Sequence, residues 1–300
     1  MFITNLASPK PTAPAPALAR APHKKARPGS CDTHVHLLAA ANEFPLYEGR
    51  AEDPPSGYKF QEWIGLYRRH LENLGCTRGV IVHSIFYGTD NSVTVAALRE
   101  MGAGFRGIGL LPDQASEADL DQFVAWNMAG VRLNYVHGGV LSWKGAKAMA
   151  PKLADRGLHI QMLMHAHLHM NELQPDLQSL SVPVCFDHIG WPDLTLGTGN
   201  AGLETLYHML DSGKVWIKLS GLYRLANAPY FDTDEIVSKL VRANPERCLW
   251  GSDWPHIMLN GAEMPDAGSL MDAFYRVVSD EKTRDQILIE NPKKLYGFAD

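Results

Sequence analysis

The hydrophobic positions form short apolar runs, rich in β-branched residues, that recur at intervals from residue 30 to the end of the chain. Most of these runs are apolar throughout instead of alternating with polar residues, which is typical of parallel strands covered on both faces. About eight strands are predicted, at Cys31–Leu37, Gly79–Ser84, Gly107–Leu111, Gly130–Tyr135, Leu158–His165, Val182–His188, Val215–Ser220 and Cys248–Asp253.

The stretches between these runs have helical periodicity. In Phe60–Leu74, for example, Ile64, Tyr67 and Leu71 recur at a spacing of three or four residues. Further helices are predicted at Ser92–Met101, Glu117–Trp126, Lys144–Asp155, Leu203–Asp211, Phe231–Ala243 and Asp266–Val278. Because strands and helices alternate about eight times, the pattern predicts an α/β fold, a single-domain (β/α)8 TIM barrel, which commonly occupies about 250 residues.

Residues 1–28 differ from the rest because they are rich in Pro and Ala, with Lys24, Lys25 and Arg27 near their end. This composition predicts a flexible N-terminal arm at 1–28, followed by the barrel at 29–300. Such an arm is either disordered or packs on a neighbouring subunit of a homo-oligomer.

Composition excludes several classes of partner. The formal net charge of −5 leaves no basic excess, so a nucleic acid is not expected. No apolar run reaches the roughly 18 residues that span a membrane, and the N-terminus lacks the charged-then-apolar order of a secretory signal. The four cysteines contain no Cys-x-x-Cys pair and are expected to be reduced core thiols of a cytoplasmic protein.

Candidate chemistry begins in the first strand, which reads Cys31-Asp32-Thr33-His34-Val35-His36-Leu37. Side chains two residues apart on a strand share a face, so His34 and His36 point the same way. Two adjacent imidazoles can hold a metal or polarise a substrate oxygen. The alternative is a pair of surface histidines without function. The last strand, ending at Asp253, favours the functional interpretation because it brings a carboxylate to a turn.

In a barrel, the carboxyl ends of the strands meet at one mouth, where active sites lie. The polar residues at or near the predicted strand ends are His34, His36, His83, Ser84, Tyr87, Arg132, Asn134, Gln161, His165, Asp187, His188, Lys218, Ser220, Arg224, Asp253 and His256. A buried lysine needs a partner, so Lys218 is expected to pair with Asp253 or Asp187. Asp187, next to His188, is expected to point away from the site.

Several motifs, in order along the chain, resemble the amidohydrolase superfamily, and most closely its lactone hydrolase branch, which includes 2-pyrone-4,6-dicarboxylate lactonase. The motifs are Asp32-Thr33-His34-Val35-His36, Gly88-Thr89-Asp90-Asn91, Gly130-Val131-Arg132-Leu133-Asn134, Phe186-Asp187-His188-Ile189-Gly190-Trp191-Pro192-Asp193, Trp250-Gly251-Ser252-Asp253-Trp254-Pro255-His256 and Asn291-Pro292-Lys293-Lys294-Leu295-Tyr296.

The resemblance implies an enzyme that opens a carboxylated lactone by attack of water. It implies that His34, His36 and His188 hold or polarise the substrate carbonyl, and that Asp253 is the general base. It also implies that Arg132 and Arg224 bind substrate carboxylates, which agrees with the bidentate geometry of arginine.

Three further residues, Tyr87, Asn134 and His256, are candidates for substrate binding, although Tyr87 could pack over the barrel end and His256 could be a hydrogen-bonded loop residue. The chain also departs from the lactonase pattern. The loop Tyr135–Gly139 lacks a second arginine, Tyr87 replaces a histidine, and Met162–His165 replaces an aromatic pair. A muconolactone-like or sugar-acid lactone therefore competes with the pyrone dicarboxylate as substrate.

The histidine at the end of the fifth predicted strand leads us to predict a bound metal. The pyrone branch works without a metal, but metal-using relatives carry a histidine at this position, where this chain has His165. Zinc or manganese held by His34, His36, His165 and Asp253 is favoured over the alternative of no metal. His167 and His169 follow in alternation.

Three functions compete at this point. The first is a lactonase, the second a metal-dependent decarboxylase of the same superfamily, and the third a non-catalytic barrel that binds carboxylates. The third has no need for His34, His36, His188 and Asp253 together.

Overall fold

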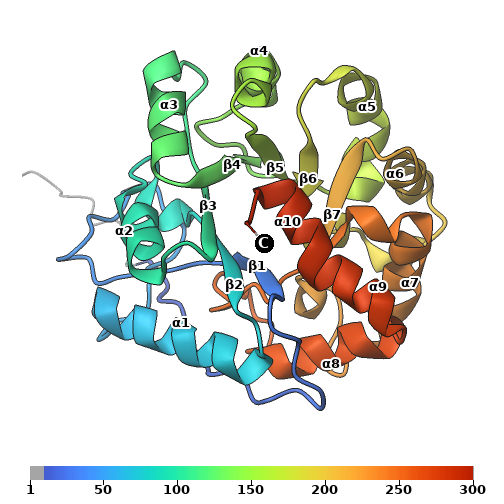
Figure 1. Cartoon of the computed structure of the whole chain (residues 1–300), viewed down its shortest axis with the longest axis horizontal. Helices are drawn as coiled ribbons and strands as arrows, with labels where there is room; N and C mark the ends of the chain where they lie inside the picture. Colours follow the sequence, from blue (N-terminus) through green and yellow to red (C-terminus); the bar gives the residue numbers. More distant parts are fainter. Residues whose placement is uncertain (1–9, 300) are drawn as a thin grey trace, which may run out of the picture.

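The computed structural model describes residues 10–299 and contains eight parallel strands that pair in sequence order. They surround a common axis with the helices outside (Figure 1). The ring closes where the first and last strands meet, since Asp253 N donates to His34 O at 2.9 Å and His36 N donates to Trp254 O at 2.8 Å. The strands are β1 (Cys31–Val35), β2 (Arg78–Val82), β3 (Phe105–Gly109), β4 (Met128–Asn134), β5 (His159–Leu163), β6 (Val184–Phe186), β7 (Val215–Leu219) and β8 (Cys248–Trp250).

The predicted TIM barrel is thus confirmed, and each predicted strand is present within a few residues. The α-helices are α1 (Phe60–Leu74), α2 (Ser92–Met101), α3 (Glu117–Ala125), α4 (Trp143–Ala154), α5 (Ala166–Ser179), α6 (Ala201–Asp211), α7 (Asp234–Ala243), α8 (Ala267–Val277), α9 (Glu281–Asp285) and α10 (Asn291–Tyr296). Sequence analysis did not predict α5, a difference that matters for the histidines at its start.

Local sequence signals account for several helix ends. The Ser116 hydroxyl and the Asp119 carboxylate form a reciprocal capping box at the start of α3. Asn200 and Asp266 cap α6 and α8 by accepting backbone N–H groups. Gly75 ends α1 in the left-handed conformation with a φ of 86°, which glycine adopts without steric cost.

The core has two layers. The larger one fills the space between strands and helices and includes the buried side chains of Trp63, Tyr67 and Phe274. The smaller one fills the barrel interior and includes Leu295 and Tyr296 of α10. In Figure 1, α10 crosses the centre of the ring, and the C-terminus lies there. Because α10 covers this end, only the opposite end, at the carboxyl termini of the strands, is available for a mouth.

Residues 10–28, which we call the N-terminal strap, do not match the expected flexible arm. Ala13, Ala19 and Ala26 are buried, Ala26 N donates to Leu74 O at 2.8 Å, and Arg20 forms an ion pair with Asp272 at 2.5 Å. The strap therefore packs on its own barrel, because its alanines are small enough to fit closely against it. Residues 1–9 of the predicted arm lie outside the described residues.

Among residues 10–299, no helix has the length and apolar character needed to cross a membrane.

Candidate active site

A cavity of about 760 Å³ opens at the carboxyl ends of the strands. Its wall includes seven of the residues singled out from sequence, namely His36, Ser84, Arg132, Asn134, His188, Arg224 and Asp253. The remaining lining comes mainly from the loops after β1, β4 and β8. The polar strand-end residues thus meet at one mouth, as the barrel predicted.

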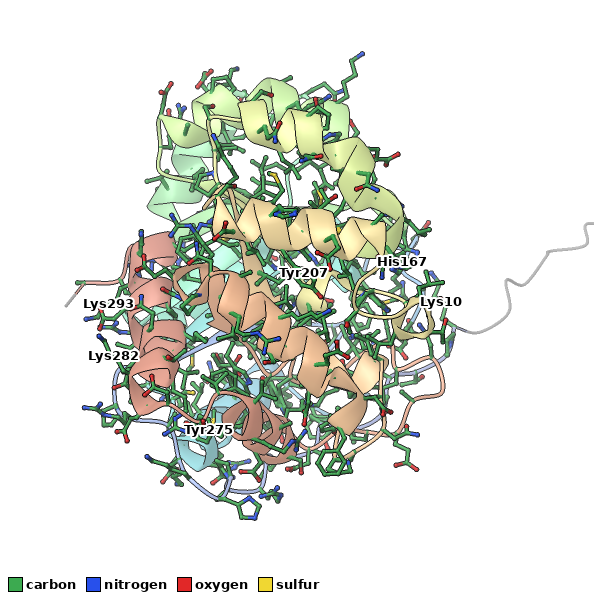
Figure 2. The ribbon with its side chains drawn as sticks, turned by 90° about the vertical axis from the view of Figure 1, so that its right-hand side faces the viewer. Lys10, His167, Tyr207, Tyr275, Lys282 and Lys293 are labelled. Atoms are coloured by element: carbon green, nitrogen blue, oxygen red, sulfur yellow. The ribbon has the colours of Figure 1, made fainter. Side chains whose placement is uncertain are left out.

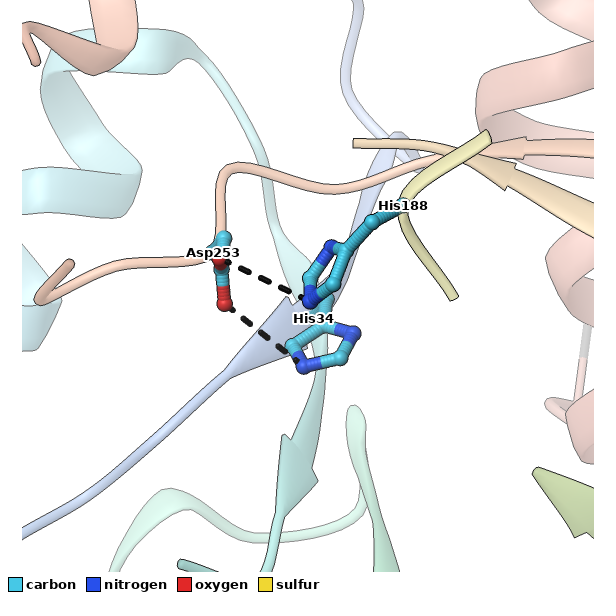
Figure 3. A group of neighbouring side chains, drawn as sticks. All are labelled: His34, His188 and Asp253. Carbon is cyan, nitrogen blue, oxygen red and sulfur yellow. Dashed lines mark ion pairs between the residues drawn. The ribbon is translucent and has the colours of Figure 1, made fainter. Parts of the chain in front are cut away.

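At the bottom of this cavity three histidines face one carboxylate; His36 and His188 line the cavity, and His34 lies buried behind them. His34 Nε2 and His36 Nε2 each lie 3.6 Å from Asp253 Oδ1, and His188 Nε2 lies 3.7 Å from Asp253 Oδ2. Figure 3 shows Asp253 opposite the imidazoles of His34 and His188. We call His34, His36 and His188 the floor histidines. The two ends of the chain therefore supply the two sides of one site.

The other ring nitrogen of each floor histidine is held from behind. His36 Nδ1 lies 2.8 Å from the Val82 carbonyl, and His188 Nδ1 lies 3.0 Å from the Ser220 hydroxyl. A carbonyl oxygen can only accept, so His36 Nδ1 carries a proton, and in the neutral ring its Nε2 presents a lone pair to the cavity. Burial lowers the pKa of His188 to about 4, so the His188 ring is neutral at physiological pH.

His34 is oriented by a buried charged network. Its Nδ1 lies 3.2 Å from Asp187 Oδ1, and Lys218 Nζ lies 3.6 Å from the same oxygen. Lys218 also donates to Gln161 Oε1 at 2.6 Å. Burial would raise the pKa of Asp187, but His34 and Lys218 lower it below its usual range. Asp187 therefore stays ionised beside His34 Nδ1, which also lies 3.4 Å from Lys218 Nζ.

This network resolves two expectations from the sequence. Lys218 pairs with Asp187, one of its two expected partners. The expectation that Asp187 points away from the site was wrong, because a carboxylate directed outward could not compensate the charge of Lys218 inside the barrel.

Asp253 itself is held by two residues on the turn after β7. The Tyr223 hydroxyl donates to Asp253 Oδ2 at 2.7 Å, and Arg224 Nη2 donates to the same oxygen at 2.9 Å. Burial opposes ionisation, but His188 and Arg224 keep the pKa of Asp253 well below its ordinary value. Tyr223 was missed by sequence reasoning, although its position next to Arg224 on a strand-end turn was an available signal.

Close backbone packing makes room for the floor histidines. A Cβ added at Gly221 would lie 2.7 Å from the His188 ring, and one at Gly251 would lie 2.8 Å from His34 Cβ. Glycine is therefore required at both positions. The backbone at His188 and Asp253 has φ values of 53° and 63°, in the left-handed region that non-glycine residues seldom adopt.

The wall of the cavity carries Arg132 and Asn134 from the end of β4. Arg132 Nη1 donates to His83 O at 2.8 Å, whereas its Nε is buried without a partner among residues 10–299. Asn134 Oδ1 accepts from His137 N at 2.9 Å, which fixes the following loop. Arg132 therefore lines the cavity with an incompletely satisfied guanidinium, while the side chain of Asn134 also has a structural task.

Besides His34, three further candidates do not line the cavity wall. Tyr87 is buried, and its hydroxyl accepts from Ala39 N at 2.8 Å, so it packs over the barrel end. His256 is buried against the edge of Tyr223. Neither residue lines the cavity. The structure thus supports the packing alternative for Tyr87. The His256 ring does not match the hydrogen-bonded alternative, since its Nδ1 is buried without a partner among the described residues.

His165, the third candidate, is also separate from the floor histidines. It is the N-cap of α5, and its Nδ1 lies 2.9 Å from the Trp191 carbonyl. The expected metal set with His165 therefore requires correction. The chain turns into a helix directly after His165, so His167 and His169 lie on α5 and do not continue a strand.

The residues present fit a divalent cation at the floor. Ligand atoms of His34, His188 and Asp253 all lie within 4.8 Å of one another, while atoms that share one zinc lie roughly 3.4 Å apart. Within the described residues, His34 Nε2 is buried without a hydrogen-bond partner. Lone pairs that face a carboxylate repel it unless a cation, a proton or a water lies between them. A metal would satisfy His34, His188 and Asp253, with His36 beside them.

Comparison with known proteins agrees with this site. Residues 31–298 match the Amidohydrolase (Amidohydro_2) family, and the chain belongs to this family. It is 31% identical to 2-pyrone-4,6-dicarboxylate hydrolase of Comamonas testosteroni, over 92% of each chain. It is 30% identical to 4-sulfomuconolactone hydrolase of Hydrogenophaga intermedia, over 90% of this chain and 89% of the relative.

Solved structures show the same barrel. The apo structure of Agrobacterium tumefaciens ATU3138 has a TM-score of 0.82 at 25% identity and covers 93% of this chain and 99% of its own. A Burkholderia multivorans amidohydrolase with bound zinc has a TM-score of 0.66 at 18% identity, over 90% of this chain and 99% of its own. The second likeness establishes the shared fold alone.

Proposed function

We propose that this protein hydrolyses the ester bond of a lactone that carries a carboxylate. The observation that carries the proposal is the convergence of three imidazole Nε2 atoms on the Asp253 carboxylate at the floor of a cavity. Hydrolysis needs a base for water and an electrophile at the carbonyl. Asp253 supplies the base, and the floor histidines orient the carbonyl through a metal or, where an Nε2 carries a proton, directly. The relatives whose names specify lactone hydrolysis support the same reaction.

The geometry gives Arg224 a role in setting the strength of the base. Arg224 lines the cavity and also pairs with Asp253 at 2.9 Å. A low pKa makes Asp253 a weak base. Arg224 therefore keeps Asp253 ionised and limits its strength as a base, and in this arrangement it is not free to bind a substrate carboxylate.

Charges in the cavity favour a substrate with one carboxylate. Arg224 is paired with Asp253, and Arg50 is paired with Asp53 at 2.5 Å. Within residues 10–299, Arg132 has no ion-pair partner, and its Nε is unsatisfied. One free cation matches one anionic group. We therefore expect a monocarboxylated lactone, such as muconolactone, to be hydrolysed more efficiently than 2-pyrone-4,6-dicarboxylate.

We further propose that one zinc or manganese ion binds His34, His188 and Asp253, with His36 adjacent. A bound divalent metal supplies Lewis acidity and lowers the pKa of water. The alternative is catalysis by the same residues without a metal. Elemental analysis of the purified protein should find about one equivalent of metal, and chelation should lower activity, whereas full activity of metal-stripped protein would contradict the proposal.

The reaction is tested by incubating the purified protein with muconolactone and with 2-pyrone-4,6-dicarboxylate in ¹⁸O-labelled water. A lactonase produces a ring-opened acid with one ¹⁸O atom in the new carboxylate. Release of carbon dioxide instead would identify the competing decarboxylase. Tight binding without turnover across a broader lactone panel would favour the non-catalytic barrel.

The proposed partner is thus a small carboxylated lactone, and neither nucleic acid nor membrane is expected. Cys31, Cys76, Cys185 and Cys248 are free and buried, which supports a cytoplasmic location. Assembly into a homo-oligomer stays a prediction.

A further inference from the structure

One wall of the cavity is an irregular segment, the β1–α1 loop (residues 36–59), which contains no helix or strand. Tyr47, Gly49, Arg50 and Ala51 of this loop line the cavity. Long connections without secondary structure have many accessible conformations unless specific contacts restrict them. The contacts that hold this loop therefore determine the shape of the cavity.

The N-terminal strap supplies several of these contacts. Asp53 N donates to Pro11 O at 2.7 Å, and Ala13 N donates to Asp53 O at 2.8 Å. The Lys10 ammonium donates to the Arg50 carbonyl at 2.7 Å and also to the Glu48 carbonyl. In Figure 2, Lys10 lies at the same end of the molecule as His167, opposite Lys282 and Lys293. The start of the strap is thus at the mouth of the barrel.

The contacts continue from this loop to the catalytic base. Glu52 accepts from Met258 N at 2.8 Å, and the Met258 carbonyl accepts from Arg224 Nη1 at 3.2 Å. Arg224 in turn holds Asp253. A second connection is direct, since Trp254 Nε1, next to Asp253 in sequence, donates to Ala17 O at 2.9 Å.

We infer that residues 10–17 of the strap are a positioning element of the active site. They touch neither the floor histidines nor Asp253. They fix the β1–α1 loop and, through Glu52, the loop that carries Met258. Their loss should loosen the wall that holds the substrate while leaving the floor intact. The kinetic part of this inference rests on the proposed function, whereas the structural part does not.

Two variants of the full-length chain test the inference. Lys10→Met removes the ammonium that binds the two loop carbonyls, and Ala13→Pro removes the N–H that donates to Asp53. Each has a matched control on the same strap. Lys24→Met removes a lysine whose partner is Glu281, at 3.2 Å, on α9. Ala15→Pro changes an exposed position whose N–H has no hydrogen bond among the described residues.

The first measurement is hydrogen exchange of the amides of Tyr47 and Met258, which the strap does not touch directly. Tyr47 N donates to Phe86 O, and Met258 N donates to Glu52. Lys10→Met and Ala13→Pro should each accelerate exchange roughly fivefold, as for the loss of one net hydrogen bond, and the two controls should not. Unchanged exchange in both test variants would overturn the inference.

The second measurement is steady-state hydrolysis of muconolactone. The test variants should raise KM roughly fivefold while kcat stays within about twofold, since only substrate binding is affected. A fall in kcat with unchanged KM would overturn the positioning role. If the unaltered protein hydrolyses no lactone, the proposed function fails, and the exchange data alone decide whether the strap positions the loop.

Discussion

Two groups of three histidines stand out among the described residues, and two members of the second group, His167 and His169, are oriented opposite to the first. The floor histidines come from three different places in the chain and converge on Asp253. His165, His167 and His169, which we call the rim histidines, lie within one turn and a half at the start of α5. Proximity in sequence therefore did not identify the site, whereas convergence on a carboxylate did.

The hydrogen bonds of the two groups explain their different chemistry. His36 has its Nδ1 against a carbonyl, so in the neutral ring its Nε2 lone pair faces the cavity. In the rim group, His167 Nδ1 accepts from Asp193 N at 3.0 Å, and His169 Nδ1 accepts from His165 N at 3.1 Å. Their Nε2 atoms consequently carry the proton in the neutral ring. Floor histidines can act as ligands, whereas His167 and His169 act as caps of backbone groups.

The largest difference in kcat between the floor and the rim should appear when a carboxylate beside each group of histidines is replaced. Asp253→Asn keeps the shape of the side chain and removes the base, so kcat should fall roughly 10³-fold. Asp193→Asn, beside the rim histidines, should leave kcat unchanged because Asp193 only accepts from Thr195 in its own turn. Kinetics with muconolactone measure both variants. A near-normal rate for Asp253→Asn would reject its role.

The second largest difference, in kcat/KM, is expected when one imidazole of each group is replaced. His188→Gln should lower kcat/KM roughly 10²-fold by removing one group that orients the carbonyl. The matched rim variant His169→Gln should change it less than about twofold. If both variants lost kcat/KM equally, the floor and rim histidines would not differ in their contribution to the reaction.

Acidification should test the buried histidines through stability. Burial lowers the pKa of His83 and His188 to about 4, whereas an unfolded histidine has a pKa of about 6.5. Between these values the unfolded state binds more protons, so the free energy of unfolding should fall as the pH falls. Each of these two histidines should lower the free energy of unfolding by on the order of 2 kcal/mol between about pH 6.5 and pH 5.

Urea denaturation at these two pH values measures the effect. His83→Gln should reduce the pH dependence, while His167→Gln, at a partly exposed rim position, should reduce it much less. Stability that rises on acidification over this range would contradict the assignment of neutral buried rings.

The smallest effect is expected for His165. His165→Gln should leave the metal content of the protein within about twofold of its original value, because the ring is held by the Trp191 carbonyl and is not among the clustered ligand atoms. Elemental analysis alongside His188→Gln measures this. Loss of metal in His165→Gln would restore the set predicted from sequence.

The sequence predicted the barrel and most of the site because both depend on short-range patterns. Apolar runs located all eight strands, and helical spacing gave α1 and α2 their observed bounds. The resemblance then placed His34, His188 and Asp253 at one mouth, where the structure has them. Strand alternation together with barrel topology was enough to predict where these residues lie.

The misses have a different physical origin. The alternating His165, His167 and His169 resembled a strand and obscured the helical spacing of Met170, Leu173 and Leu177, which are the buried positions of α5. The contacts of Tyr223 with Asp253 and of Lys10 with the β1–α1 loop join distant parts of the chain. Such contacts depend on the closed fold and leave no local pattern in the sequence.

The opposite placement of the two ends of the described chain has a practical consequence for handling the protein. Lys10 lies at the mouth, whereas α10 and the C-terminus cover the other end of the barrel. An affinity tag or carrier domain fused ahead of the strap would be tethered beside the substrate entrance. A fusion at the C-terminus would project from the closed side, which makes it the better choice for immobilising the protein on a surface.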